Sequence, residues 1–154
     1  MFARAWSPPG DPRYAEVEET VSFMLRFPSG AIASCTAGYG AHETKDFRLR
    51  MERGFVELEN AFAYKGQRMR IASRDGDCES VNEIRIGQAD QFALEIDHFA
   101  DCILSDKRPR TPGEEGVQDH RLMEAIYHSA REDGPVALAP VPGLDAFRGP
   151  ALKD

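Results

Sequence analysis

Two helical patterns in succession occupy most of residues 91–138 and follow a long stretch in which every regular pattern is that of a strand. In the first pattern, Asp90 is a suitable N-cap. One face of the helix that follows carries a narrow apolar stripe formed by Phe92, Ile96, Phe99 and Ile103. The order of strands first and helices second predicts an α+β layered domain.

The second helical pattern has a strong start signal. Thr111-Pro112-Gly113-Glu114 matches a capping box with Pro112 at the first helical position. The predicted apolar stripe consists of Leu122, Met123, Ile126 and Ala130. Gly134 and Pro135 should end the helix, and residues 135–138 are predicted as a short final strand. Asp119 falls on the same stripe by helical angle, so we expect a buried carboxylate with a structural partner.

The region before the helices alternates between apolar and polar residues, which is typical of strands with one buried face. Residues 28–30, Pro-Ser-Gly, should form a turn. Residues 31–39 are mostly small, so we expect a helix to lie over this strand. Tight turns between short strands favour an open, mostly antiparallel sheet with helices on one face. The predicted strands are residues 16–27, 31–39, 46–52, 55–60, 68–72 and 80–86.

Length and composition narrow the possible roles. A chain of 154 residues fits one domain, which we place at residues 1–139, with a Pro- and Gly-rich surface tail at 140–154. The net charge of −7 argues against nucleic-acid binding, and there is neither an apolar run long enough for a membrane span nor a signal peptide. Cys35, Cys78 and Cys102 are odd in number and widely spaced, which indicates reduced thiols in a cytoplasmic protein.

Three segments together resemble a known enzyme family. They are FMLRFPSGAIASCTAGYG, FRLRMERGFVELENAFAY and DHFADCILSDKRPRTPGEEGVQDHRLMEAIYHSA. Their order and spacing are similar to the C-terminal domain of the Gfo/Idh/MocA oxidoreductases, in the glucose–fructose oxidoreductase-like branch. The resemblance implies an open antiparallel sheet backed by helices, which forms one wall of a substrate pocket and commonly mediates oligomerisation. Members act on sugars, polyols and related compounds with NAD or NADP, which is held by an N-terminal Rossmann domain.

The sequence also departs from the family. It contains no GxGxxG after a strand, no match to the family's Glu-Lys-Pro motif, and no match to its helical Asp with His or Tyr four residues on. Hydride transfer needs a bound cofactor and a nearby acid or base. We therefore expect no catalytic residue, no bound cofactor and no turnover in this chain alone, with the Rossmann domain in the same or a separate chain. We favour a piece of a longer enzyme over a short gene product.

Five side chains are candidates for the substrate side: Tyr39, His42, Lys45, Tyr64 and Lys65. The first three lie in the loop YGAHETKD, which the resemblance places near the pocket, and a polyol would need such hydrogen-bonding groups. We favour the alternative, in which these three residues belong to a solvated polar loop. Tyr64 and Lys65 lie in a predicted turn. They either contact a ligand or serve only to cap the turn.

His98 and Cys102 are four residues apart on one helical face. Two ligands fall short of a closed zinc site, so we expect no metal. An ordinary exposed histidine is the expectation for His98, and likewise for His120 and His128.

Charged residues of both signs decorate adjoining strands, namely Arg48, Arg50, Glu52, Glu57 and Glu59. They either form cross-strand pairs on an exposed face or line a contact between two sheets. Open sheets are usually covered, and a two-fold homodimer is the common solution. We therefore expect a homo-oligomer formed through the open sheet.

The leading hypothesis is a substrate-pocket and oligomerisation domain of an NAD(P)-dependent oxidoreductase that acts on sugars, polyols or related compounds. The alternative is a standalone dimeric scaffold or small-ligand binding module without enzyme activity. A third possibility is a small enzyme that uses His42 as a base.

Overall fold

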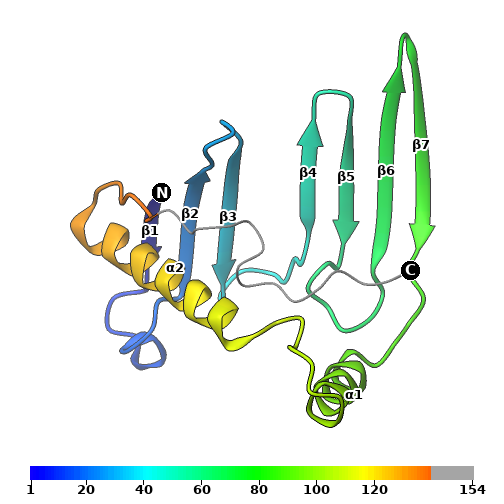
Figure 1. Ribbon diagram of the computed structural model, residues 1–154. Helices are drawn as coiled ribbons and strands as arrows, with labels where there is room; N and C mark the ends of the chain where they lie inside the picture. Colours follow the sequence, from blue (N-terminus) through cyan, green and yellow to red (C-terminus); the bar gives the residue numbers. More distant parts are fainter. Residues whose placement is uncertain (140–154) are drawn as a thin grey trace. The chain divides into compact units, whose positions relative to one another are not determined.

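The computed structural model describes residues 1–139 and confirms the α+β class (Figure 1). The expectation of a surface tail at 140–154 lies outside the described residues. The strands divide between two antiparallel sheets, one of three strands and one of four. The chain also divides into two compact units: Met1–Ala41 together with the chain from Lys107 onward, and His42–Asp106. Each unit holds one sheet and one helix.

The first unit contains the sheet β1-β2-β3, made of β1 (Phe2–Trp6), β2 (Thr20–Arg26) and β3 (Ile32–Gly38). The predicted alternation holds in β2 from Val21 onward, where Val21, Phe23 and Leu25 are half-buried and Ser22, Met24 and Arg26 are exposed. The turn before β3 forms as predicted, with Gly30 at a φ of +90°. Strand β1 was not predicted, because five residues that include two alanines and an arginine carry little alternation.

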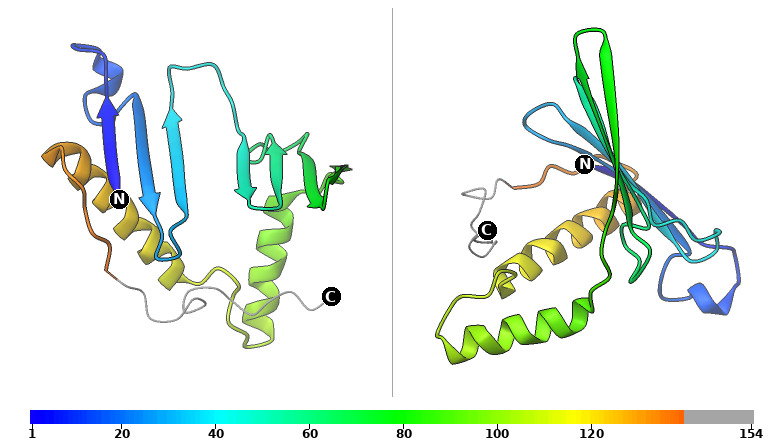
Figure 2. Two further views of the ribbon diagram at one scale, coloured as in Figure 1. Left: turned by 90° about the horizontal axis from the view of Figure 1, so that it is seen from above. Right: turned by 90° about the vertical axis from the view of Figure 1, so that its right-hand side faces the viewer.

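Helix α2 (Gly113–Glu132) lies along one face of this sheet (Figure 2). Its close contacts are with β1, whereas the small residues of β3 had suggested a helix over that strand. Ser129 is fully buried at this contact; its Oγ accepts the N–H of Ala3 at 2.9 Å and donates to the carbonyl of Gly134 at 2.6 Å. The contact between helix and sheet is therefore a small core with a hydrogen bond at its centre.

Both ends of α2 differ from the prediction. Pro112 is the N-cap, Thr111 lies before it, and no side chain caps the helix. Glu114 instead stabilises the first turn: its pKa is lowered by a backbone N–H and by Arg108, whose Nη2 lies 3.4 Å from Oε2 of Glu114. At the other end Asp133, not Gly134, takes the left-handed conformation, with a φ of 52°.

Two further predictions about this region are wrong. Asp119 is exposed, because α2 packs on the sheet only through its second half, around Ile126 and Ser129. Residues 135–138 do not form a strand. Val136 pairs with Met1 alone, through a 2.9 Å bond from its N–H and a 2.7 Å bond to its carbonyl, so the strand-like pairing does not extend.

The second unit contains the sheet β4-β5-β6-β7, in which every neighbouring pair is antiparallel. Its strands lie close to the predicted segments: β4 (Phe47–Met51), β5 (Gly54–Glu59), β6 (Arg68–Asp75) and β7 (Cys78–Arg85). Gly54 begins β5 opposite Ser73. A Cβ at Gly54 would collide with the carbonyl of Ala72, so the sequence needs glycine there for the two backbones to approach.

Helix α1 (Gln91–Leu104) begins as predicted. The carboxylate of Asp90 accepts the N–H groups of Phe92 and Ala93, both at 3.1 Å. The apolar stripe exists, but its four residues are between 52 and 68% exposed. The apolar stripe therefore predicted helix α1 correctly. It did not predict that the side chains of the stripe would remain exposed. Within residues 1–139, neither helix is long and apolar enough to cross a membrane.

Candidate functional site

Tyr39 follows β3 at one end of the first unit's sheet. Its N–H donates to the carbonyl of Glu19 at 2.9 Å, while its side chain is 78% exposed. Gly40 comes next, and a Cβ there would overlap the carboxylate of Glu19, which is itself buried. The close approach of the backbone to Glu19 fixes where the chain leaves β3 and therefore where Tyr39 stands.

A second tyrosine reaches the same unit from α2. The hydroxyl of Tyr127 donates to the carboxylate of Glu18, at 2.9 Å from Oε2 and 3.2 Å from Oε1. This hydrogen bond raises the pKa of Tyr127, with smaller contributions from desolvation, the charge of Glu18 and the neighbouring Tyr39. One neighbourhood therefore contains Tyr39, Glu18 and Tyr127. Of these three residues, the sequence analysis had singled out only Tyr39.

A cavity of about 340 Å³ opens beside Glu18 and Tyr127. Aromatic side chains line it together with acids and one arginine: Trp6, Tyr14, Glu16, Glu18, Tyr127 and Arg131. Aromatic rings present apolar faces and carboxylates accept hydrogen bonds from hydroxyl groups. This is a suitable lining for a small ligand that carries both C–H and O–H groups.

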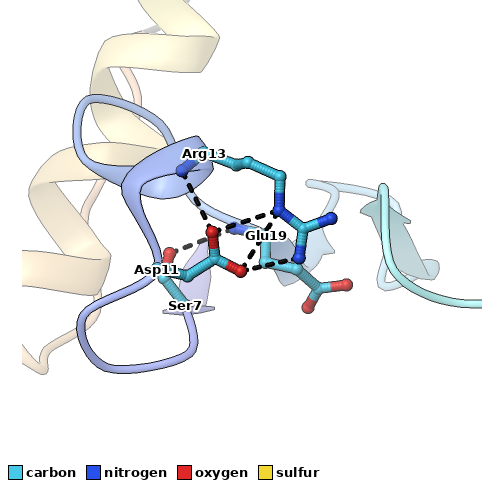
Figure 3. Close-up of polar contacts among 4 residues, drawn as sticks. All are labelled: Ser7, Asp11, Arg13 and Glu19. Carbon is cyan, nitrogen blue, oxygen red and sulfur yellow. Dashed lines mark hydrogen bonds and ion pairs between the residues drawn. The ribbon is translucent and has the colours of Figure 1, made fainter.

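The loop between β1 and β2 forms part of the cavity wall and is held by its own polar contacts (Figure 3). The carboxylate of Asp11 accepts Nη2 of Arg13 at 2.6 Å and the N–H of Arg13 at 3.0 Å, which caps the short helix η1 (Pro12–Tyr14). These bonds lower the pKa of Asp11. Ser7 Oγ accepts the N–H of Glu19 at 3.1 Å, which closes the loop beside Glu18.

Tyr64 and Lys65 lie together in the second unit, in the turn between β5 and β6. The ring of Tyr64 meets that of Phe92 edge-on, with centroids 5.3 Å apart. Both residues line a pocket of about 380 Å³ with residues 88–92. Asn60 secures the turn, since its Nδ2 donates to the carbonyl of Gly66 at 3.1 Å. Both residues lie in a turn, as predicted, and the turn also shapes a pocket.

His42 and Lys45 belong to the second unit and lie in the loop before β4. Lys45 forms an ion pair with Glu43, and its hydrogen bond lowers the pKa of Glu43. His42 is exposed. Neither residue lines either of the two cavities described above, so the structure gathers Tyr64 with Lys65 but does not join His42 and Lys45 to them.

Glu18, Tyr127 and Trp6 are site residues that sequence reasoning missed. Glu18 and Tyr127 are separated by 109 positions, and no local pattern marks either of them. Trp6 lies in the strand that was not predicted. Only the packing of α2 on β1 brings the three together.

The pair His98 and Cys102 does face one side of α1, with Sγ 3.6 Å from Nε2. Cys102 is buried, whereas His98 is exposed. Among residues 1–139, no three His, Cys, Asp or Glu side chains gather where they could hold a metal ion. The His98–Cys102 contact is a local one between successive helical turns.

Comparison with known proteins gives relatives that share one kind of chemistry in their names. D-xylose 1-dehydrogenase [NADP(+)] of Haloarcula marismortui is 32% identical over 126 residues, which cover 81% of this chain and 34% of the relative. D-xylose 1-dehydrogenase (NADP(+)) 2 of Haloferax volcanii is 27% identical over 135 residues, or 88% of this chain and 41% of the relative. The chain therefore spans about two fifths or less of the curated relatives that it matches.

A solved structure shows the same fold. Aldose-aldose oxidoreductase from Caulobacter crescentus, complexed with glycerol, is 36% identical with a TM-score of 0.77 and covers 89% of this chain and 40% of its own. The family model of the oxidoreductase C-terminal alpha/beta domain matches residues 1–138. The chain therefore belongs to the Gfo/Idh/MocA oxidoreductase family, in its glucose–fructose oxidoreductase-like branch, and corresponds to the family's C-terminal domain.

Proposed function

We propose that this chain is the substrate-pocket and oligomerisation domain of an NAD(P)-dependent, cytoplasmic oxidoreductase that acts on sugars, polyols or related compounds, and that it has no turnover alone. The observation that carries the proposal is the family match over residues 1–138, with relatives whose names all state aldose chemistry. Aldose oxidation is therefore the leading activity for the whole enzyme. The three free cysteines fit a reducing compartment.

The first unit's cavity supports a role in holding sugar. Along its lining Tyr127 offers a hydroxyl group, Glu18 offers a carboxylate, and Trp6 offers an apolar ring face. The exposed Tyr39 is a neighbour of Tyr127 outside this lining and remains a candidate. A polyhydroxylated ligand needs several convergent polar groups of this kind. In the second unit, Tyr64 and Lys65 provide a further hydroxyl and a cation beside a pocket. His42 and Lys45 remain candidates from the loop before β4.

The described residues do not suit a dinucleotide. A pyrophosphate is held by a glycine-rich turn at the positive N-terminus of a helix. Here α1 begins at Asp90, whose carboxylate already occupies the first N–H groups, and the first turn of α2 carries Glu114 and Glu115. Negative side chains at both helix starts would repel a phosphate. The nicotinamide cofactor, which supplies hydride transfer when bound, therefore belongs to another domain.

The test joins this chain to the cofactor domain of the Haloarcula marismortui D-xylose dehydrogenase. We expect no NADPH formation from D-xylose or other aldoses by the chain alone, and measurable formation by the chimera. Tyr39→Phe in the chimera should raise KM about three- to tenfold, since one hydrogen bond is lost. Turnover by the chain alone would contradict the inactivity, and a folded chimera inactive on every aldose would contradict the substrate class.

A further inference from the structure

The cavity beside Glu18 and Tyr127 is bounded on one side by the loop between β1 and β2. Residues 14–18 of this loop line the cavity consecutively, and residues 15–18 belong to no helix or strand. The other lining residues are residues 5–7, at the end of β1, and three residues of α2. Strand β1 is fixed by its pairing with β2, and α2 packs on β1. The loop side therefore depends on its own contacts for its shape.

The carboxylate of Asp11 makes most of these contacts (Figure 3). Its Oδ2 accepts Nη2 of Arg13 at 2.6 Å and Nε at 3.2 Å, while its Oδ1 accepts Nε at 3.1 Å and the backbone N–H of Arg13 at 3.0 Å. The backbone closes the same turn, because the N–H of Tyr14 donates to the carbonyl of Asp11 at 3.1 Å. A guanidinium group bound by paired hydrogen bonds is fixed in direction as well as distance. Arg13 is therefore held in one orientation.

Arg13 in turn contacts the ring of Tyr14. Its Cζ lies 5.3 Å from the centroid of that ring, which is within the range of a cation–π contact. Tyr14 is half-buried and is the first loop residue that lines the cavity. The contacts from Asp11 through Arg13 therefore end at an aromatic ring in the cavity wall.

Stability of the fold is a weak explanation for these contacts. The side chain of Arg13 is 74% exposed, although that of Asp11 is only 20% exposed. An ion pair with an exposed partner contributes little to the free energy of unfolding. The four hydrogen bonds between this carboxylate and one neighbouring arginine are better explained by the loop geometry that they impose.

We propose that Asp11, acting through Arg13, is a positioning residue that holds the ring of Tyr14 as the loop-side wall of the cavity, where the C–H face of a neutral sugar lies. Trp6 provides a second aromatic surface in the same lining. A wall that is ordered before the ligand arrives saves the entropy of ordering it on binding. This inference rests on the proposed role of the cavity in holding sugar and adds the residues that fix one wall.

The charges of the lining favour a neutral ligand. Of the described residues, the lining includes two acids, Glu16 and Glu18, and one base, Arg131. Like charges in close contact are unfavourable, so a carboxylate or phosphate group on the sugar would meet an excess of negative charge. Carboxylate oxygens accept hydrogen bonds from hydroxyl groups. A neutral aldose or polyol therefore fits, with C–H groups against the rings and hydroxyl groups toward the acids.

The chain contains its own probe of this cavity. Trp6 is the single tryptophan of the sequence and lines the cavity, so its fluorescence should report a ligand bound there. Titration of the whole chain with D-xylose or xylitol should give a saturable change and a dissociation constant. Asp11→Ala should raise this constant about three- to tenfold, because the ligand itself must then immobilise the ring of Tyr14. The urea midpoint of Asp11→Ala should stay unchanged, since the ion pair is exposed.

Further variants test whether Asp11 acts through Arg13 and Tyr14. Arg13→Lys keeps the charge but cannot form the paired hydrogen bonds, so it should raise the dissociation constant about threefold or more. Tyr14→Leu should raise it about three- to tenfold through loss of the aromatic face, and Tyr14→Phe, which keeps the ring, should raise it less. The double variant Asp11→Ala/Tyr14→Leu should lie within about twofold of Tyr14→Leu, because no ring remains to be positioned.

Glu59→Ala is the matched control. It removes an exposed pair of the same type in the second unit, where Arg68 Nη2 lies 2.9 Å from Glu59 Oε2, and it should leave the dissociation constant unchanged. Additive effects of Asp11→Ala and Tyr14→Leu, or no effect of Asp11→Ala, would overturn the positioning role. Trp6 fluorescence that responds to neither D-xylose nor xylitol would overturn the sugar site itself.

The chimera with the cofactor domain separates this inference from the proposed function. In an active chimera, Asp11→Ala should raise KM about three- to tenfold and leave kcat within about twofold, because the wall contacts substrate and transition state alike. An active chimera with an unchanged KM rejects the positioning role and retains the proposed function. A chimera inactive on every aldose, built from a chain whose Trp6 fluorescence responds to D-xylose, rejects the proposed activity and retains the sugar site.

Discussion

The sheets of the two units differ in how a helix packs against them. In the first unit, α2 buries Ala3, Ile126 and Ser129 against β1. In the second, the described residues place no such core between α1 and the sheet: Ala72 is buried, but Phe47, Leu49 and Met51 are all 46% exposed or more. The first unit is therefore held by a helix-to-sheet contact, and the second mainly by the pairing of its strands.

The comparison shows where each unit can be broken. The first unit is stabilised by burial and by a buried hydrogen bond between α2 and β1. Removing a single atom at that contact should therefore lower its stability. The second unit is stabilised by close backbone approach and by cross-strand pairs. Its stability should therefore depend more on the geometry of strand pairing than on any exposed side chain.

Gly54→Val should have the largest effect, with a loss of about 3 kcal/mol in the free energy of unfolding. Its Cβ would meet the carbonyl of Ala72, which is backbone and cannot move aside without shifting β6. Hydrogen exchange should show faster exchange in β5 and β6 than in β2 and β3. Gly87→Val is the matched control, since nothing lies within 4 Å of its Cβ position. Equal losses for both variants would contradict the close approach.

Ser129→Ala should cost about 2 kcal/mol, because the N–H of Ala3 would be left buried without its acceptor. Chemical denaturation measures the loss, and hydrogen exchange should place it in β1 and the second half of α2. Ser34→Ala, at an exposed position on β3, is expected to change stability little. If Ser129→Ala were as stable as the original, the first unit would not depend on this contact.

Asp90→Ala should cost about 1 kcal/mol, since the first N–H groups of α1 lose their cap. Because the stripe of α1 is exposed, the loss should show as faster exchange in the first turn of α1 with the strands unchanged. Asp97→Ala, in the middle of the same helix, is the control. Faster exchange throughout β4–β7 would mean that α1 supports the sheet more than its exposure indicates.

Tyr127 gives the smallest effect, seen in its titration. The pKa of Tyr127 in the folded chain lies above its usual 10.0, first because of the hydrogen bond to Glu18. The stability that this bond contributes is therefore present below the unfolded pKa and is lost as pH rises through the folded pKa. Ultraviolet difference titration against Tyr127→Phe should show a raised midpoint, and Glu18→Gln should return it toward 10.0. An unchanged midpoint in Glu18→Gln would contradict the contact.

Much of the fold was predictable because its signals are local. Alternation located β2 to β7, and the start of α1 followed from Asp90. Strand β1 was missed because its five residues show little pattern, and the burial of Asp119 was predicted wrongly because helical angle says nothing of how far along α2 the sheet extends. Tyr39 stays a predicted site residue, whereas its neighbours Glu18 and Tyr127, which the sequence analysis did not single out, come from distant segments.

The sequence by itself determined the α+β class, the family and the run of alternating strands, because these depend on residues close together in the chain. The tertiary structure decided the division into two units, the buried Ser129 between α2 and β1, and the cavity beside Glu18 and Tyr127. It also decided the register that aligns Arg48, Glu57, Arg70 and Glu83 across four strands. Register depends on turns and pairing between strands, and no single strand contains that information.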